Sequence, residues 1–114
     1  MHEAMAAENI IESVLSHIGS KKGRVVSIVI SCGQLNALND EAMEFAFAAA
    51  AEGTVCKGAK LKIKHIPLMA KCSNCKKKFS YDFYNPQCPK CGHSDIEIGE
   101  DSPLLLEEIE FEEY

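Results

Sequence analysis

Hydrophobic and polar residues follow different periods in different parts of the chain, and each period predicts a different element. In residues 4–18 the apolar side chains recur on one helical face, with glutamates off that face. The members of this face are Ile10, Ile11, Val14, Leu15 and Ile18. Gly19 follows in the position of a helix C-cap. We therefore expect a first helix over residues 4–18.

Three further segments have the pattern of β-strands. Residues 24–32 are rich in β-branched side chains. Residues 59–66 alternate strictly, with lysines on one face, which is typical of a half-buried strand with one solvated face. A last strand is predicted around Leu106, Ile109 and Phe111, with glutamates outward. Because its length and pattern match residues 59–66, lysines on one strand could face glutamates on the other.

A second helical segment lies between the first two strands. Asn39 or Asp40 can cap its N-terminus, and Gly53 ends it. Glu41 and Glu44 lie in its first turn, where the helix dipole favours negative charge. The resulting order of elements predicts an α+β fold, with two helices on a small three-stranded antiparallel or mixed sheet.

Four cysteines interrupt this pattern before the last strand. They form two Cys-x-x-Cys pairs separated by twelve residues, namely Cys72 and Cys75, then Cys88 and Cys91. This spacing is typical of a four-thiolate zinc site, which has no open coordination position and is therefore structural. The same pairs can hold a single iron ion. Two disulfides are the remaining alternative, although nothing else in the sequence indicates an oxidising compartment.

The position of the cysteines predicts how the chain is divided. We expect a zinc-ribbon-like zinc-binding domain at residues 68–100, inserted into an α/β domain formed by residues 1–67 and 101–114. Aromatic side chains between the cysteine pairs are expected to cover the zinc site. They are Phe79, Tyr81, Phe83 and Tyr84.

Composition and charge narrow the classes of protein. The formal net charge is −5, with nine acidic residues in 95–113 and eight lysines in 57–78. An acidic chain lacks the electrostatic footprint of a general nucleic-acid binder, although the lysine-rich stretch keeps that option open locally. No apolar run is long enough to span a bilayer, and the first residues do not resemble a secretory signal. We therefore expect reduced cysteines in a cytoplasmic protein without a membrane partner.

The first three residues, Met1, His2 and Glu3, form a second candidate metal site. The terminal amine, the deprotonated amide nitrogen of His2 and its imidazole can form fused chelate rings around one ion. With a fourth ligand in the plane, this field suits Ni²⁺ or Cu²⁺. The signal is poor by itself and needs support from the rest of the chain.

That support comes from the order of the motifs. The chain opens with Met-His-Glu before a helix. It continues with a strand ending in Ile-Ser-Cys-Gly-Gln-Leu-Asn, the segment Glu-Ala-Met-Glu-Phe-Ala-Phe, the paired cysteines and an acidic last strand. In this order the sequence resembles the HypA/HybF family of nickel metallochaperones. The resemblance implies a nickel domain of two helices on a three-stranded sheet, with a four-cysteine zinc domain inserted before the last strand.

The resemblance also implies ligands and partners. Transient Ni(II) would bind at the chain start, at Met1, His2 and Glu3, and structural Zn(II) at the four cysteines. The partners would be a HypB-type GTPase, the NiFe-hydrogenase large subunit and, for some members, urease accessory proteins. We expect a monomer or a weak homodimer. Because no nucleophile–base pair or phosphate loop is visible, we expect a non-enzyme. The alternative is a zinc-ribbon adaptor or nucleic-acid-binding protein in which the chain start has no nickel role.

Some residues depart from the family pattern or have more than one interpretation. Gln34 replaces a common glutamate, and Asn36 stands where a serine is usual. Asp40 could supply a weak axial oxygen or act only as a cap, and His93 could be a spare ligand. The other side chains considered are expected to be buried, structural or solvated, with partner docking as the alternative for the lysines. They are Cys32, Cys56, His17, His65 and the lysine run 76–78.

Overall fold

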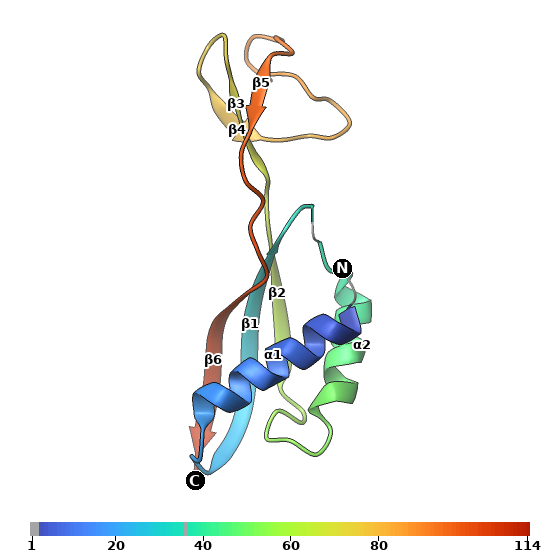
Figure 1. Ribbon diagram of the computed structural model, residues 1–114, viewed down its shortest axis with the longest axis vertical. Coiled ribbons are helices and arrows are strands. Elements are labelled where there is room, and N and C mark those ends of the chain that lie inside the picture. Colours follow the sequence, from blue (N-terminus) through green and yellow to red (C-terminus); the bar gives the residue numbers. More distant parts are fainter. Residues whose placement is uncertain (1–2, 36) are drawn as a thin grey trace.

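The computed structural model describes residues 3–35 and 37–114. Its elements, in chain order, are α1 (Glu3–Ile18), β1 (Gly23–Gly33), α2 (Asp40–Ala51), β2 (Lys60–Ile66), β3 (Met69–Cys72), β4 (Lys78–Ser80), β5 (Ile96–Ile98) and β6 (Leu105–Glu113). Within these residues the strands form two three-stranded sheets, which lie at opposite ends of a molecule measuring 57 × 23 × 17 Å (Figure 1).

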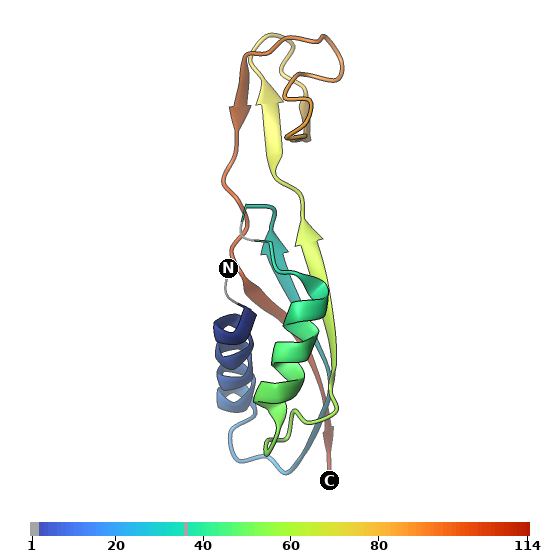
Figure 2. The same cartoon turned by 90° about the vertical axis from the view of Figure 1, so that its right-hand side faces the viewer.

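The first sheet has the strand order β2-β1-β6. Strand β1 runs parallel to β2 and antiparallel to β6, so the sheet is mixed. Helices α1 and α2 lie side by side over one face of this sheet (Figure 2). The predicted α+β fold, with two helices on a three-stranded mixed sheet, is confirmed.

The core lies between this sheet and the two helices. Ile28 and Ile30 of β1 are fully buried, and they belong to one cluster with Val14 of α1 and with Met43 and Phe47 of α2. Burying a large aliphatic side chain stabilises a fold by about 1.5–3 kcal/mol. The helical period of α1 and the β-branched run of β1 therefore direct apolar side chains from the two layers into the same core.

The predicted proximity of the lysine-bearing and glutamate-bearing strands was wrong. Strand β1 lies between β2 and β6, so β6 pairs with β1 and not with β2. Strand β1 takes the central position because it is almost uncharged, whereas charged strands are tolerated at sheet edges. The glutamates of β6 instead accept hydrogen bonds from β1, where Ser27 Oγ donates to Glu110 at 2.9 Å and Ser31 Oγ to Glu107 at 2.7 Å.

Two helix ends predicted from the sequence, the N-cap of α2 and the glycine after α1, are confirmed. Asn39, not Asp40, is the N-cap of α2, and its Oδ1 accepts a hydrogen bond from Ala42 N at 2.9 Å. Gly19 follows α1 with φ of 64° and donates its N–H to Leu15 O at 3.0 Å. A left-handed conformation at this position is the usual way for a helix to end at glycine.

The second sheet is small and was not predicted strand by strand. Strands β4, β3 and β5 are joined in that order by antiparallel pairing, and each has only three or four residues. Its buried cluster consists of Ala70, Cys72, Phe79 and Cys88. A cluster of this size is too small to hold a module together without a metal or a disulfide.

The chain passes between the two sheets twice, at residues 67–68 and 99–104 (Figure 1). At the first crossing, Leu68 is buried and its N–H donates to Gln34 Oε1 at 2.6 Å. Gln34 therefore has a structural contact at the position where the family resemblance led us to expect a glutamate.

Asp101 fixes the second crossing. Its carboxylate accepts hydrogen bonds from Gln34 N at 2.8 Å and Leu35 N at 2.9 Å. Gly33 makes this approach possible, because a Cβ there would lie 2.3 Å from Asp101 Cγ. The end of β1 is thus tied to both segments that lead to the second sheet.

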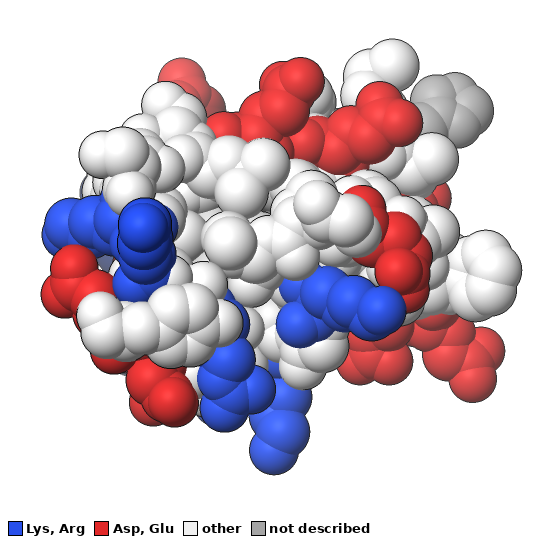
Figure 3. Space-filling view, turned by 90° about the horizontal axis from the view of Figure 1, so that it is seen from below, with Lys and Arg blue, Asp and Glu red and all other residues white. Residues whose placement is uncertain are grey.

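No helix in the described part of the chain is both long and apolar enough to cross a membrane. Figure 3 shows the end of the molecule away from the second sheet, where Lys and Arg lie among Asp and Glu. This end therefore has no field of a single sign, such as a nucleic-acid backbone would require.

Candidate metal centres

The four predicted cysteine ligands come together at one point. Their sulfur atoms all lie within 4.8 Å of one another. Cys72 Sγ is 3.6 Å from Cys91 Sγ, and Cys75 Sγ is 3.5 Å from Cys88 Sγ. In the described residues this is the one group of at least three His, Cys, Asp or Glu residues with that geometry. The second sheet therefore carries a four-cysteine metal-binding site.

The dimensions of this site fit a tetrahedral zinc ion. Zn–S bonds of about 2.3 Å at tetrahedral angles place neighbouring sulfurs about 3.8 Å apart. The two short S···S distances are 3.5 and 3.6 Å, so the sulfurs need to move by only a few tenths of an ångström. Small adjustments of the side-chain torsions are enough to provide that movement.

The two Cys-x-x-Cys pairs have the same backbone geometry. In the first, Lys76 N donates to Cys72 O at 2.9 Å, and Lys76 has φ of 66°. In the second, Gly92 N donates to Cys88 O at 2.8 Å, and Gly92 has φ of 72°. The sequence provides glycine for this left-handed position only in the second pair, so Lys76 carries the strain that Gly92 avoids.

The close contact of the thiols separates their pKa values. The backbone N–H of Cys75 lowers the pKa of Cys72. Desolvation by burial raises the pKa of Cys88. The backbone N–H groups of Cys91 and Lys90 and the nearby sulfurs outweigh desolvation and lower this pKa to about 6. The backbone N–H of Lys77 lowers the pKa of Cys75, but desolvation and the other sulfurs together raise it to about 11. The metal-free set therefore holds protons at neutral pH, which a metal ion must displace.

The predicted cover of aromatic side chains is partly wrong. Phe79 is buried in the cysteine cluster and Tyr81 packs against it. Phe83 contacts Tyr81 edge to face with 4.8 Å between ring centroids, yet it is 50% exposed, and Tyr84 is 99% exposed. Phe79 and Tyr81 therefore lie against the cysteine cluster, whereas Phe83 and Tyr84, in the loop that follows, are exposed.

His93, the candidate spare ligand, does not join the cysteine cluster. Its Nδ1 accepts a hydrogen bond from Asp95 N at 3.2 Å, and its side chain is exposed. The backbone carbonyl of His93 accepts from Cys88 N at 3.0 Å. His93 thus contributes to the second cysteine turn through its main chain.

The predicted nickel ligands Met1 and His2 lie outside the described residues, as does Asn36. Glu3 is described and begins α1. Its Oε1 lies 3.3 Å from the backbone N–H of Asn39, the cap of α2. The starts of the two helices are therefore adjacent, and the Glu3 carboxylate is engaged in a structural contact.

A third group of side chains was not recognised from the sequence as one site. His65 Nε2 lies 2.6 Å from Asp40 Oδ1, and His65 Nδ1 lies 3.6 Å from Cys32 Sγ. The signal was available, because the alternation that puts Leu61 and Ile63 on the helix-facing side of β2 continues to His65. The strand pattern places a histidine where an aliphatic side chain would be expected.

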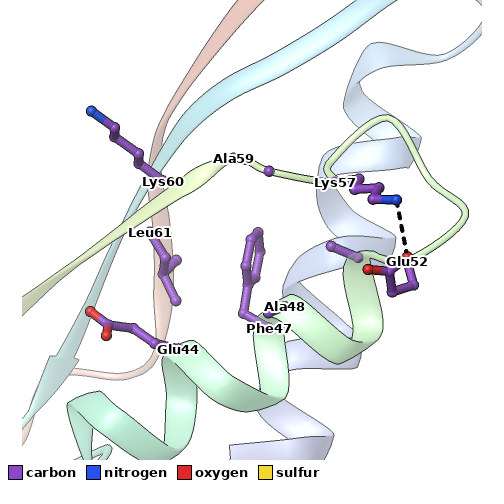
Figure 4. A pocket seen from close by; sticks show the side chains of 10 residues that line it. Glu44, Phe47, Ala48, Glu52, Lys57, Ala59, Lys60 and Leu61 are labelled. Atoms are coloured by element: carbon purple, nitrogen blue, oxygen red, sulfur yellow. Dashed lines mark ion pairs between the residues drawn. The ribbon is translucent and has the colours of Figure 1, made fainter.

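An open groove lies between the end of α2 and the start of β2 (Figure 4). Phe47, Ala48 and Leu61 supply its apolar walls. Its charged side chains include Glu52 and Lys57, which pair with each other at 3.5 Å.

Comparison with known proteins establishes the family. A protein-family model described as HypA, hydrogenase/urease nickel incorporation, metallochaperone, matches residues 1–111. The chain belongs to the HypA family. The resemblance drawn from the order of motifs is confirmed, and the chain is thereby a member of a family of nickel-incorporation metallochaperones that act in hydrogenase maturation.

Several curated HypA relatives support this assignment. Hydrogenase maturation factor HypA of Desulfitobacterium hafniense is 40% identical over 103 residues, which cover 90% of this chain and 89% of that protein. The factor of the same name from Methanococcus aeolicus is 33% identical, with 86% of each chain covered. That of Geobacter sulfurreducens is 31% identical over 98% of this chain and 100% of its own.

Solved HypA structures support the fold. The solution structure of the Ni metallochaperone HypA from Helicobacter pylori has a TM-score of 0.62 at 23% identity, with 97% of each chain covered. A second solution structure of a HypA protein has a TM-score of 0.64 at 23% identity. At this identity the likeness concerns the fold alone.

Proposed function

We propose that this HypA-family chain binds Ni²⁺ at its first three residues and helps to deliver it to the NiFe-hydrogenase large subunit. The ligands would be the amine of Met1, the amide and imidazole nitrogens of His2, and the backbone amide of Glu3. The observation that carries the proposal is the family match, which begins at residue 1 and includes this tripeptide. Nitrogen donors in one plane provide the square field that suits Ni²⁺.

The surroundings of Glu3 support a backbone role for this residue. Its side chain reaches Asn39 N, so its carboxylate is directed to α2. The main-chain nitrogen of Glu3 directly follows His2 in the chain. It is therefore the Glu3 donor nearer in sequence to an ion held by the two preceding residues. A site at the start of a helix can also open without unfolding the core, because terminal turns fray at low free-energy cost. Such opening suits an ion that must be released.

We assign the four-cysteine site to structural Zn²⁺. A closed set of four thiolates leaves no position for substrate, and Zn²⁺ contributes folding free energy to small modules of this kind. Residues 68–100 would form a zinc-binding domain, with residues 1–67 and 101–114 as the nickel-binding domain. The separate buried clusters of the two sheets support this division.

The proposed partners follow from the family. They are a HypB-type GTPase, the hydrogenase large subunit and, for some members, urease accessory proteins. The protein would act in the cytoplasm, as a monomer or weak homodimer. We assign it no catalytic activity of its own, in keeping with its membership of a metallochaperone family.

Nickel titration by calorimetry tests this proposal. The zinc-loaded chain should bind one Ni²⁺, and His2→Ala should remove that binding. A chain with one residue added before Met1 should also bind nickel weakly, because the amine is displaced. His17→Ala is the matched control, since His17 lies at the other end of α1. Stoichiometric binding that survives His2→Ala would overturn the assignment of the site.

A further inference from the structure

We propose that Cys32 and His65 form a second, separate metal site, in which one thiolate and one imidazole hold a zinc-like divalent ion and Asp40 orients the imidazole. This inference goes beyond the nickel function and does not depend on it. It rests on three side chains that come from different elements, namely the end of β1, the end of β2 and the start of α2.

The sheet register places the two ligands together. Strands β1 and β2 are parallel, and Cys32 and His65 are directly paired residues. Their side chains lie on the helix-facing side of the sheet, where Cys32 is completely buried in the core cluster. The side chain of His65 is 43% exposed, so one side of the pair faces water.

The separation of the two atoms matches a shared ion. Cys32 Sγ and His65 Nδ1 are 3.6 Å apart. An ion at about 2.3 Å from sulfur and about 2.05 Å from nitrogen, with a tetrahedral angle between them, requires about 3.6 Å. Thiolate and imidazole are ligands that Zn²⁺ prefers. Water from the exposed side of His65 can complete the coordination.

The contact with Asp40 prepares the imidazole for this role. Asp40 Oδ1 lies 2.6 Å from His65 Nε2, and an ionised carboxylate can only accept a hydrogen bond. The ring proton is therefore on Nε2, and the lone pair of Nδ1 is available on the side of Cys32. Histidine ligands in metalloproteins commonly donate their second nitrogen to a carboxylate in this way, which fixes the tautomer and the ring orientation.

The competing explanation is a hydrogen bond from the Cys32 thiol to His65 Nδ1, with no ion involved. The two explanations predict different spectra when metal is added. A thiolate bound to Co²⁺ gives an intense ligand-to-metal charge-transfer band, whereas a thiol hydrogen bond gives none. Co²⁺ is a suitable probe because it binds such sites more weakly than Zn²⁺ and so leaves a zinc-filled four-cysteine site intact.

The experiment is a Co²⁺ titration of the full chain preloaded with one equivalent of Zn²⁺, whose retention is checked by metal analysis. The unmodified chain should develop the charge-transfer band, saturating at one equivalent of Co²⁺. Cys32→Ala should remove the band. Cys56→Ala is the matched control and should retain it, because Cys56 is also completely buried but hydrogen bonds to Thr54 instead.

Two more variants test the roles of the other residues. His65→Gln should also remove the band, and it keeps the test valid if circular dichroism shows that Cys32→Ala does not fold. Asp40→Asn should weaken Co²⁺ binding by about 10- to 100-fold while keeping the band at saturation, as expected for a residue that positions a ligand.

The outcome is independent of the nickel proposal. His2→Ala should leave the charge-transfer band unchanged, because the chain start offers no sulfur ligand of this kind. The absence of a band in the unmodified chain, or a band that survives Cys32→Ala in a folded protein, would overturn the second site. Either result would leave the test of nickel binding at His2 unaffected.

Discussion

Glu3 Oε1 lies 3.3 Å from the backbone N–H of Asn39, so the first residue of α1 is joined to the cap of α2. The contact connects the segment proposed to bind nickel with the N-terminal end of the second helix. It also separates two roles for Glu3, one for its carboxylate and one for its main-chain nitrogen.

Substitutions of Glu3 should affect stability through its carboxylate while leaving nickel binding by its main-chain nitrogen in place. Glu3→Ala removes the contact to Asn39 and should lower the free energy of unfolding by about 0.5–1.5 kcal/mol, the usual contribution of one hydrogen bond. Glu3→Gln keeps an acceptor oxygen and should stay near the unmodified value. If only the main chain of Glu3 binds nickel, both variants should keep the nickel stoichiometry in calorimetry. Loss of binding in Glu3→Gln would show that the carboxylate is a ligand.

A second prediction concerns the unequal cysteine turns. Lys76 has φ of 66°, where its counterpart is a glycine. Lys76→Gly should relieve this strain, offset in part by the flexibility that glycine adds to the unfolded chain, for a net gain of about 0.5–1 kcal/mol. Because zinc binding is coupled to folding, the gain should appear as about two- to fivefold tighter zinc binding in competition with a chelator. Lys77→Gly is the control and should give no gain.

Removal of zinc should affect the two sheets differently. The buried cluster of the second sheet is too small to persist alone, and structural zinc contributes about 10–16 kcal/mol in small peptides. Chelation should therefore collapse the amide spectrum of residues 69–98, while resonances from β1, β2 and β6 remain dispersed. An unchanged spectrum for β3 and β5 in the zinc-free chain would contradict a structural role for the metal.

Zinc binding should also release protons from the four cysteine thiols, and the number released should depend on pH. In the metal-free set the pKa of Cys75 is raised to about 11 and that of Cys88 is lowered to about 6. At neutral pH some thiols are already ionised and others are not, so fewer than four protons should be displaced. The number should fall as the pH rises from about 6.5 to about 9, and apparent zinc affinity should rise over the same range, because fewer protons compete.

Calorimetry in buffers of different ionisation enthalpy measures this release. A count that stays constant across that pH range would mean that the four sulfurs do not share their protons as the geometry indicates. Cys56→Ala is again a useful control, since burial raises the pKa of that thiol and its side chain lies outside the cysteine cluster.

The parts of the fold governed by local periodicity were predictable. The helical face around Val14, the β-branched run of β1 and the cap at Asn39 each depend on residues close in the sequence, and the structure has them where the pattern placed them. Leu15 is the exception on the helical face, because it is exposed while the other four predicted members are buried. The Cys-x-x-Cys spacing likewise specifies one local turn at each pair, and the metal-binding cluster follows when two such turns meet.

What could not be predicted depends on how distant segments pair. The position of β1 between β2 and β6 is a choice among several strand orders that share the same alternation. The contact of His65 with Asp40 and Cys32 follows from that choice, since only parallel pairing of β1 with β2 brings Cys32 opposite His65. The edge strands of the second sheet were too short for any period to be visible.

The second sheet contains neither end of the chain, and this has a consequence for limited proteolysis. The most exposed large hydrophobic side chain in the described loops of this sheet is Tyr84, which lies between the two cysteine pairs. A single cut there would give two fragments, each with one Cys-x-x-Cys turn, and the smaller would still carry β6 paired along β1. The nicked protein should therefore remain one particle, and its two halves could be expressed separately and reassembled as a split protein that depends on zinc.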